Sequence, residues 1–177
     1  MEFCSELFMD DVARFDFIRA SDCKLSVPFG VANISEIQGC TFYTDYTDSN
    51  RPQAASLTFG KPVVIISRVG GDAMIGDTPQ HKVTAKREAY GHVRVHSLQI
   101  PIYAGFQTLR EIEKSIKGVD FNVIVHTIDG TRYLAYGLPN SSDFSIEEQM
   151  GSSATMTVKA SLSSMSGFIR LQGMVAL

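Results

Sequence analysis

The stretch VDFNVIVHTIDGTRYLAYGL, residues 119–138, carries the clearest structural signal of the sequence. In its first half, apolar side chains alternate with mostly polar ones, and a period of two residues is typical of a β-strand with one buried face. Asp129 and Gly130 then stand between this segment and TRYLAYGL. Because Gly tolerates the positive φ of a type I′ turn, an Asp-Gly pair in this place predicts a β-hairpin.

The segment before this hairpin is the only one that predicts a helix. From Leu109 to Lys117 apolar side chains recur every three or four residues and form one stripe, which we expect to pack onto the sheet. Thr108 and Glu111 match the T-x-x-E capping box at its start, and Gly118 is placed to end it. The stripe consists of Phe106, Leu109, Ile112 and Ile116.

β-strands are predicted on both sides of this region. The β-branched run PVVIISRV, residues 62–69, is typical of a strand that is covered on both faces. Residues 12–18 show no clear period, and they are interpreted either as a first strand or as an ordered arm. Further short strands are predicted at residues 24–27, 35–43, 81–88, 90–100, 142–149, 154–162 and 167–175.

Length and composition agree with one β-rich domain. The chain has 177 residues, 20% of them charged, and no Trp. A chain of this size buries roughly 70% of its unfolded surface, so it needs no disulfide or metal to form a core. We therefore expect a mainly β (α+β) fold, a β-sandwich or small barrel with one amphipathic helix around Leu109 to Lys117. Residues 1–177 are expected to form a single domain, with residues 1–20 as a candidate N-terminal arm.

Charge and cysteine usage exclude several classes of partner. The formal net charge is −3 with both signs scattered, which offers no extended basic surface for nucleic acid. No apolar run approaches the roughly 20 residues of a membrane span, and the start is acidic where a secretory signal is basic. Cys4, Cys23 and Cys40 are odd in number and lack a CxxC pair, so we expect free thiols in a reducing cytosol.

No motif predicts catalysis, a cofactor or a metal. The glycine-rich segment GGDAMIGD, residues 70–77, is not a P-loop, because Asp77 follows Gly76 where a Lys and a Ser or Thr are required. His92 and His96 are four residues apart, which on a strand is roughly 13 Å and too far for one metal ion. No G-x-S-x-G nucleophile motif is present. An enzyme would require a pocket that gathers a histidine and an acid from distant parts of the chain.

Two long connections are the candidate assembly elements. Residues 44–56 and 70–80 exceed the usual hairpin length, and loops of that length in compact domains are usually functional or disordered. In the second connection we expect Met74 and Ile75 to expose apolar surface at a loop tip. The candidate assembly residues are Gly70, Gly71, Met74, Ile75, Gly76, Tyr46, Asn50 and Arg51.

The order of strands, one central helix and DFNVIVHTIDGTRYLAYGLPNSSDFSIEEQMGSSATMTVKASL resembles the tail tube and tail-ring proteins of tailed bacteriophages. The resemblance covers about residues 62–171 and rests on architecture rather than on a motif. It implies a virion structural protein, assembled in the host cytoplasm, that forms a ring with copies of itself and binds neighbouring virion proteins. It also implies that DNA passes through the ring without being read, and the mild negative charge fits such passage.

A binding module is the alternative. Exposed aromatic side chains such as Phe42, Tyr43 and Tyr46 would suit a β-sandwich that recognises carbohydrate or a host surface through its loops. Symmetry discriminates the two hypotheses, since only the first requires a ring.

Overall fold

Alternating apolar residues form strands along most of the chain. The computed structural model describes residues 9–26, 36–37, 40–43, 56–59, 61–89, 91–150, 155–164 and 169–174. Short 3-10 turns at Met9–Asp11 and Ala20–Asp22 flank the first strand. The strands are β1 (Val12–Arg19), β2 (Cys23–Ser26), β3 (Glu36–Ile37), β4 (Cys40–Tyr43), β5 (Ser56–Phe59), β6 (Val64–Ser67), β7 (Ala73–Ile75), β8 (Gln80–Glu88), β9 (Gly91–Tyr103), β10 (Phe121–Thr127), β11 (Thr131–Ala135), β12 (Asp143–Gln149), β13 (Thr155–Ser164) and β14 (Ile169–Met174).

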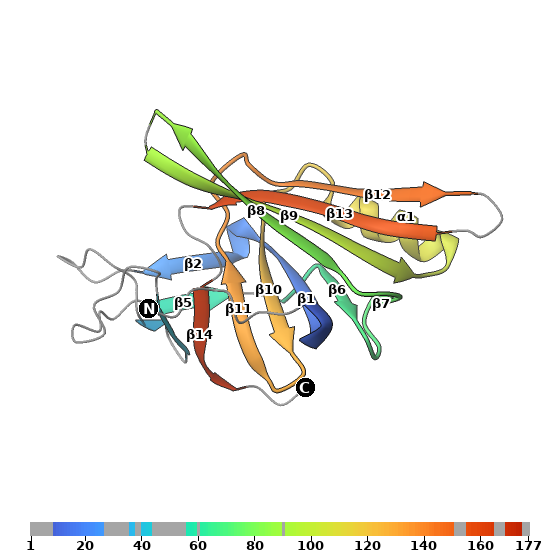
Figure 1. The fold of residues 1–177 in the computed structure, drawn as a ribbon, viewed down its shortest axis with the longest axis horizontal. Coiled ribbons are helices and arrows are strands. Elements are labelled where there is room, and N and C mark those ends of the chain that lie inside the picture. The colour runs from blue at the N-terminus through green and yellow to red at the C-terminus, as the bar shows by residue number, and fades with distance from the viewer. Residues whose placement is uncertain are drawn as a thin grey trace.

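Most of these strands join one open sheet. Its order is β12-β13-β9-β7-β6-β1-β10-β11-β14-β4-β3, and β8 pairs with β9 beside this path (Figure 1). The sheet is mixed, because β6 and β7 are parallel while the neighbouring pairs, such as β1 with β10, are antiparallel. β2 and β5 form a separate antiparallel pair.

The sheet folds over so that its β12 end packs face to face against its central strands. Four strands separate β12 from β1 in the sheet order, which in a flat sheet would hold them roughly 24 Å apart. Instead, the ring of Phe144 on β12 lies 5.4 Å from that of Phe17 on β1 and 6.2 Å from that of Phe121 on β10. The three rings meet edge to face, the arrangement that aromatic pairs prefer.

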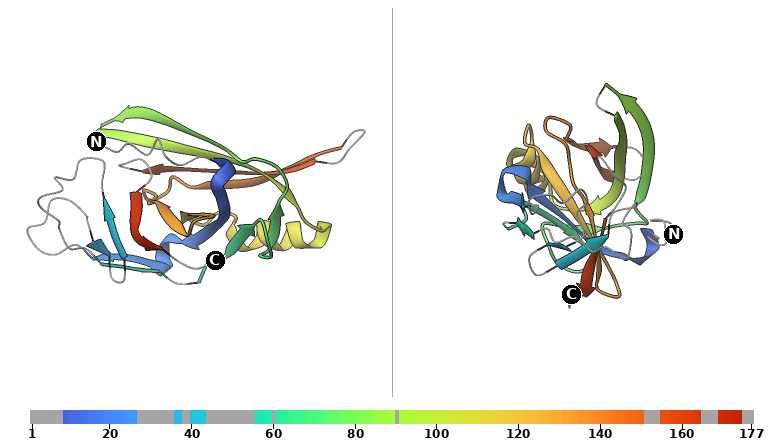
Figure 2. Two further views of the ribbon diagram at one scale, coloured as in Figure 1. Left: turned by 60° about the horizontal axis from the view of Figure 1, so that its bottom comes forward. Right: turned by 90° about the vertical axis from the view of Figure 1, so that its left-hand side faces the viewer.

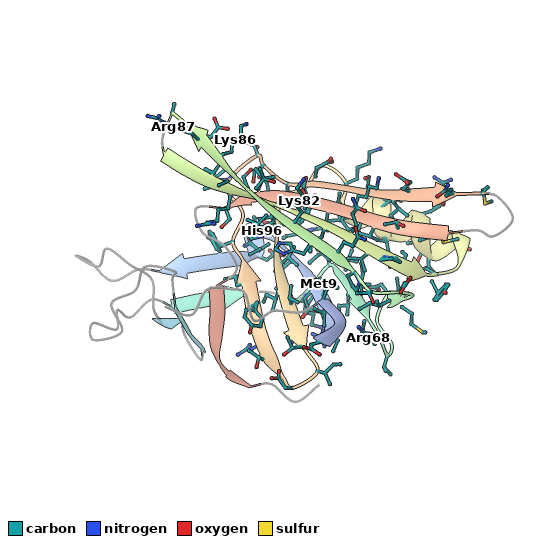
Figure 3. The ribbon with its side chains drawn as sticks, in the orientation of Figure 1. Met9, Arg68, Lys82, Lys86, Arg87 and His96 are labelled. Carbon is teal, nitrogen blue, oxygen red and sulfur yellow. The ribbon has the colours of Figure 1, made fainter. Side chains whose placement is uncertain are left out.

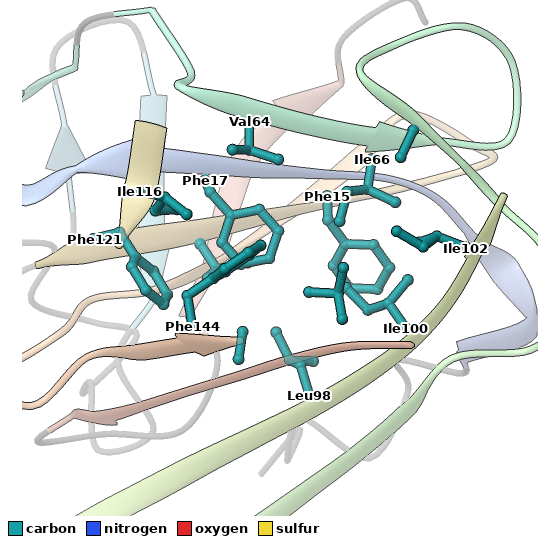
Figure 4. Packing of buried hydrophobic residues seen from close by; sticks show 14 of the residues in the cluster. Phe15, Phe17, Val64, Ile66, Leu98, Ile100, Ile102, Ile116, Phe121 and Phe144 are labelled. Carbon is teal, nitrogen blue, oxygen red and sulfur yellow. The ribbon is translucent and has the colours of Figure 1, made fainter. Parts of the chain in front are cut away.

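The core lies between these two parts of the sheet (Figure 4). Residues of one parity on each strand supply it, as a period of two predicts. Figure 4 labels Phe15, Phe17, Val64, Ile66, Leu98, Ile100, Ile102, Ile116, Phe121 and Phe144 of this cluster. β10 is buried on both faces, so it forms the interior of the sheet.

The helix, α1 (Phe106–Ile116), closes the core beside β12 and β6. Leu109, Ile112 and Ile116 are buried in the core, which confirms the predicted apolar stripe at these three positions, while the side chain of Phe106 lies outside the described part. The capping box is wrong, because the helix begins after Gly105 and no side chain caps its start. Thr108 therefore lies within the first turn. Gly118 follows the helix with φ at 72°, the left-handed conformation that ends helices.

The mainly β class with a single amphipathic helix is confirmed. The two packed layers come from one continuous sheet that folds over itself. The stretch that showed no clear period, Val12–Arg19, is a central strand between β6 and β10 rather than an arm. Residues 1–8 lie outside the described residues.

The β10–β11 hairpin forms where it was predicted, but with a different turn. Gly130 has φ at 88°, as predicted. Asp129 is not among the positive-φ residues, whereas a type I′ turn needs positive φ at both central positions. The three-residue connection between Thr127 and Thr131 instead fits a type I turn that ends in a left-handed glycine. The Asp129 carboxylate accepts hydrogen bonds from the Thr131 N–H and the Thr127 hydroxyl, which fixes this turn.

Candidate assembly surface

Four strands at one end of the sheet leave two backbone edges unpaired. β8 pairs with β9, β9 with β13, and β13 with β12, each time antiparallel. Among the described residues, β8 has no other strand partner than β9, and β12 none other than β13. Unpaired strand edges present rows of N–H and C=O groups that can pair with another chain.

The β8–β9 hairpin, residues 80–99, projects from the molecule, and we call it the arm (Figures 1 and 2). Residues 82–87 of β8 are all exposed, so both faces of this strand meet solvent. They include Val83, an apolar side chain that is 39% exposed. β13 pairs with β9 only from Arg94 to Ile102, so the part of the arm nearest its turn is a two-stranded ribbon. Such a ribbon is marginally stable, so this edge is a candidate for contact with another subunit.

The arm is basic. Residues 80–95 contain four basic residues and one acid, a formal net charge of +3, which leaves −6 on the rest of the chain of net charge −3. Lys82, Lys86 and Arg87 stand on β8 (Figure 3). Lys86 pairs with Glu88 of the same strand across 2.6 Å.

β12 is the opposite edge, and it is acidic. Asp143, Glu147 and Glu148 are exposed, and residues 143–149 contain no basic residue. Glu147 pairs with Lys159 on β13, and both side chains are well exposed. Figure 1 shows that the tip of the arm and the end of β12 lie at opposite ends of the molecule.

The face of these strands that points away from the core is polar. Ser161 on β13 lies opposite Ser97 on β9, and Lys159 lies opposite Gln99. Their neighbours of the other parity, Leu98 and Ala160 among them, are buried in the core. This agrees with the predicted alternation of ATMTVKASL, with its Ser, Thr and Lys side chains on one face.

His81 and His96 face each other at the base of the arm. Nε2 of His81 lies 3.0 Å from Nδ1 of His96, and the two rings are stacked. Burial and the neighbouring His96 lower the pKa of His81 to about 4. The histidine that lies next to His96 is therefore His81, not His92. Pairing the residues of β8 and β9 across their turn would have predicted this, because it places His81 opposite Leu98, two residues from His96.

A buried charged cluster lies on the other face of the central strands. Arg14 donates two hydrogen bonds, of 2.6 and 2.7 Å, to the carboxylate of Asp16. Nε2 of His126 lies 2.8 Å from the same carboxylate, which can only accept, so Nε2 carries the proton. Burial raises the pKa of Asp16, but the bonds from His126 and Arg14 outweigh it and leave the pKa below its usual range.

No local sequence pattern predicts this cluster, because 110 positions separate Asp16 from His126. Its members are brought together by the β1–β10 pairing, in which Arg14 lies opposite His126. The cluster is built mainly from strand residues at the centre of the sheet, where buried charges need partners. We interpret it as structural.

The connection of residues 70–80 is not a free hairpin loop. Ala73–Ile75 forms β7, which pairs with β6 on one side and with β9 on the other. Ile75 is buried in the core, so the expected exposed Met74–Ile75 pair is wrong for Ile75, while Met74 is 47% exposed. Gly71 has φ at 79°, and a Cβ there would lie 2.8 Å from the Ile65 carbonyl oxygen. Gly70 and Gly76 flank this strand.

The other candidate assembly loop, residues 44–56, lies almost wholly outside the described residues, Tyr46, Asn50 and Arg51 included. Phe42 and Tyr43 belong to β4, which pairs with β14 through Leu171 and Arg170. Of the aromatic residues expected of a binding module, Tyr46 thus lies outside the described residues, and for Phe42 and Tyr43 only the strand is described.

Within the described ranges, no group of three or more His, Cys, Asp or Glu side chains is arranged to hold a metal ion. No helix in that part of the chain is long and apolar enough to cross a membrane.

Comparisons with protein-family models, with curated proteins and with solved structures found no match to this chain.

Proposed function

We propose that this chain is a virion structural subunit that assembles with copies of itself into a ring of a phage tail, neck or tail tube. The observation that carries the proposal is the four-stranded region β12–β13–β9–β8, whose two outer edges are both unpaired in the described residues. A monomer with two such edges is prone to uncontrolled association, which natural proteins avoid by covering or closing their edges.

A ring closes both edges at once. When one edge of a subunit contacts the different, opposite edge of the next, the contact is head to tail, and a rotation that closes produces a ring with no edge left open. The backbone N–H and C=O groups of the exposed residues 82–87 of β8 then pair with the next subunit. The isolated chain exposes them because the partner is another subunit.

The polar face of the same strands suits a lumen. Ser97, Ser161 and Gln99 lie on the face that points away from the core. The charged residues of that face are of both signs: Lys82, Lys86 and Lys159 against Asp143 and Glu147. A surface with balanced charges of this kind neither traps a polyanion strongly nor reads its bases. DNA passage without sequence recognition, contact with neighbouring virion proteins and assembly in the host cytoplasm complete the proposal.

The test is the state of association of the purified protein. We expect rings or short tubes in negative-stain images and a multiple of the 19.4 kDa subunit mass by sedimentation velocity. A chain that stays monomeric at high concentration, and forms neither rings nor tubes, contradicts the proposal.

A matched pair of variants links assembly to the β8 edge. Val83→Lys places a charge on the exposed edge strand, a change that blocks edge pairing in natural sheets. It should leave the melting temperature unchanged and abolish rings. Val69→Lys is the control, because Val69 is 88% exposed and lies outside both edges. Assembly of both variants alike would remove β8 from the interface.

A further inference from the structure

We infer that β8 of one copy pairs antiparallel with β12 of the next copy, in a register that sets Lys82 opposite Glu147 and Lys86 opposite Asp143. The inference rests on the proposed function and names the two edges that meet. The partner of the basic arm is thus the acidic edge of a second copy of this chain.

Strand direction permits this contact. Three successive antiparallel pairings, β8 with β9, β9 with β13 and β13 with β12, separate the two edges within one subunit. β8 and β12 therefore run in opposite directions. Copies related by rotation about a ring axis keep these directions, so β8 of one copy approaches β12 of the next antiparallel.

The spacing of the charges selects the register. Lys82 and Lys86 are four residues apart on β8, and so are Asp143 and Glu147 on β12. All four side chains are exposed. They share one face of the sheet, because the pairings connect Lys82 through Ser97 and Ser161 to Asp143. One antiparallel register therefore satisfies both charge pairs at once, on the polar face.

The same register matches the intervening residues. It sets hydroxyl opposite hydroxyl on the polar face, apolar opposite apolar on the core face, and His81 opposite an acid. Val83, exposed in the single chain, gains an apolar neighbour there. The remaining pairs are Thr84 with Ser145, Val83 with Ile146, Ala85 with Phe144, His81 with Glu148, and Gln80 with Gln149.

Neighbouring registers lose this agreement. A shift of two residues in either direction separates both charge pairs, and one of the two shifts sets Glu88 opposite Asp143, which are like charges. A shift of one residue moves every side chain to the other face.

The pairs that Lys86 and Glu147 make within the subunit are solvent-exposed, so they can exchange for the intersubunit pairs at little cost.

The register also implies a stagger that fits a ring. Within one subunit Lys82 lies level with Asp143, through Ser97 and Ser161. Across the interface it lies level with Glu147, four residues further along, which at about 3.3 Å per residue is roughly 13 Å. Closing a sheet into a ring of tilted strands requires such a stagger between neighbours.

Charge reversal tests the pairing. The variant Lys82→Glu/Lys86→Glu makes both edges acidic, and Asp143→Lys/Glu147→Lys makes both basic. Each should raise the concentration at half assembly roughly tenfold or more, because opposed like charges disfavour cross-strand contact. The fourfold variant carries all four changes and restores opposite signs, so it should assemble near the wild-type concentration. An equimolar mixture of the two double variants should also assemble.

Lys61→Glu/Lys114→Glu is the control, since both lysines are exposed and lie outside the two edges. It should assemble as the wild type does. Circular dichroism and melting establish that each variant is folded. If the wild type assembles and the β8 double variant assembles equally well, the inference is overturned while the proposed function stands. A wild type that never assembles overturns the proposed function itself.

A cross-link tests the register without relying on charge. Residues directly opposed across strands have Cα atoms about 4.5–5.5 Å apart, within reach of a disulfide. Thr84→Cys/Ser145→Cys should therefore give a ladder of linked subunits on a non-reducing gel after oxidation of assembled protein. Thr84→Cys/Gln149→Cys represents a register shifted by four residues and should give only the background of the native cysteines. Equal ladders from both, or none from the first, would overturn the register.

Discussion

At the scale of single residues, Asp16 is the common partner in the buried cluster of polar and charged side chains. It is 3% exposed and holds Arg14 and His126 through its two carboxylate oxygens. Buried charges of this kind tolerate removal of one member poorly, because the others lose their compensation. The cluster therefore constrains the centre of the sheet.

We predict that Asp16→Asn lowers the free energy of unfolding by about 3–5 kcal/mol, measured by urea denaturation near pH 7. Asp22→Asn is the control, because Asp22 is exposed and surface changes usually stay within about 0.5 kcal/mol. The lowered pKa of Asp16 means that its ionised form is stabilised in the folded state. Its contribution is present above the unfolded pKa of about 3.9 and is lost as pH falls through the lower folded value. The two proteins should converge in acid.

His81 leads to a second prediction about the pH dependence of stability. As with Asp16, the free energy of unfolding should fall as pH falls, but at higher pH values. Its pKa is lowered from 6.5 to about 4, so between these values the unfolded chain binds a proton that the folded chain does not. Stability should fall by about 2 kcal/mol between pH 7 and pH 5 from this group alone. In His81→Gln that part of the pH dependence should disappear. Identical unfolding curves for the two proteins at both pH values would refute the assignment.

At the scale of elements, the helix stabilises the fold through one face. Ile112 is 4% exposed and belongs to the core cluster. We predict that Ile112→Ala lowers the free energy of unfolding by about 2–5 kcal/mol. Glu111→Ala, on the exposed side of the same turn, should change it by less than about 0.5 kcal/mol. Equal midpoints in chemical denaturation would mean that the stripe does not carry the packing.

The β10–β11 turn depends on one backbone conformation. Gly130 has φ at 88°, which β-branched residues adopt only with strain and which Asn tolerates better. Gly130→Val should be less stable than Gly130→Asn by at least about 1 kcal/mol. Thermal unfolding of the two variants measures the difference directly, and equal midpoints would place the turn elsewhere.

Local sequence patterns predicted the strands and the helix, but they did not predict which distant strands pair with one another. The alternation in residues 119–138 and the stripe through Ile112 are properties of short windows, and the structure confirms both. The central place of β1 was not predictable, because Val12 and Ile18 share the parity of the charged residues and blur the alternation. The charge of Asp16 also favours an exposed face, and its partner His126 belongs to a distant strand. The basic edge at β8 and the acidic edge at β12 were not predicted either, because they too depend on pairing between distant strands. Nothing local marks β8 and β12 as the two outer strands of one region.

At the scale of the whole molecule, stability is distributed unevenly. β10 is buried along its whole length and is paired with β1 and β11 on its two sides. β8 is paired on one side and exposed on both faces. Amide exchange follows local opening, so we predict that peptides covering residues 121–127 exchange slowest and those covering 82–88 among the fastest in the monomer. Mass spectrometry after deuterium exchange measures the exchange rate of both sets of peptides, and assembly should slow exchange in the peptides that cover residues 82–88.

The central position of β1 has a consequence for synthesis. This strand leaves the ribosome before its partner β10, and Asp16 meets His126 only after 110 further positions have been made. At about 5–20 residues per second, that interval lasts roughly 5–20 seconds. During it, the nascent chain holds Phe15 and Phe17 without the partner that later buries them. The centre of the sheet is thus completed only once β10 has been made, and a chaperone that shields β1 can act in that interval.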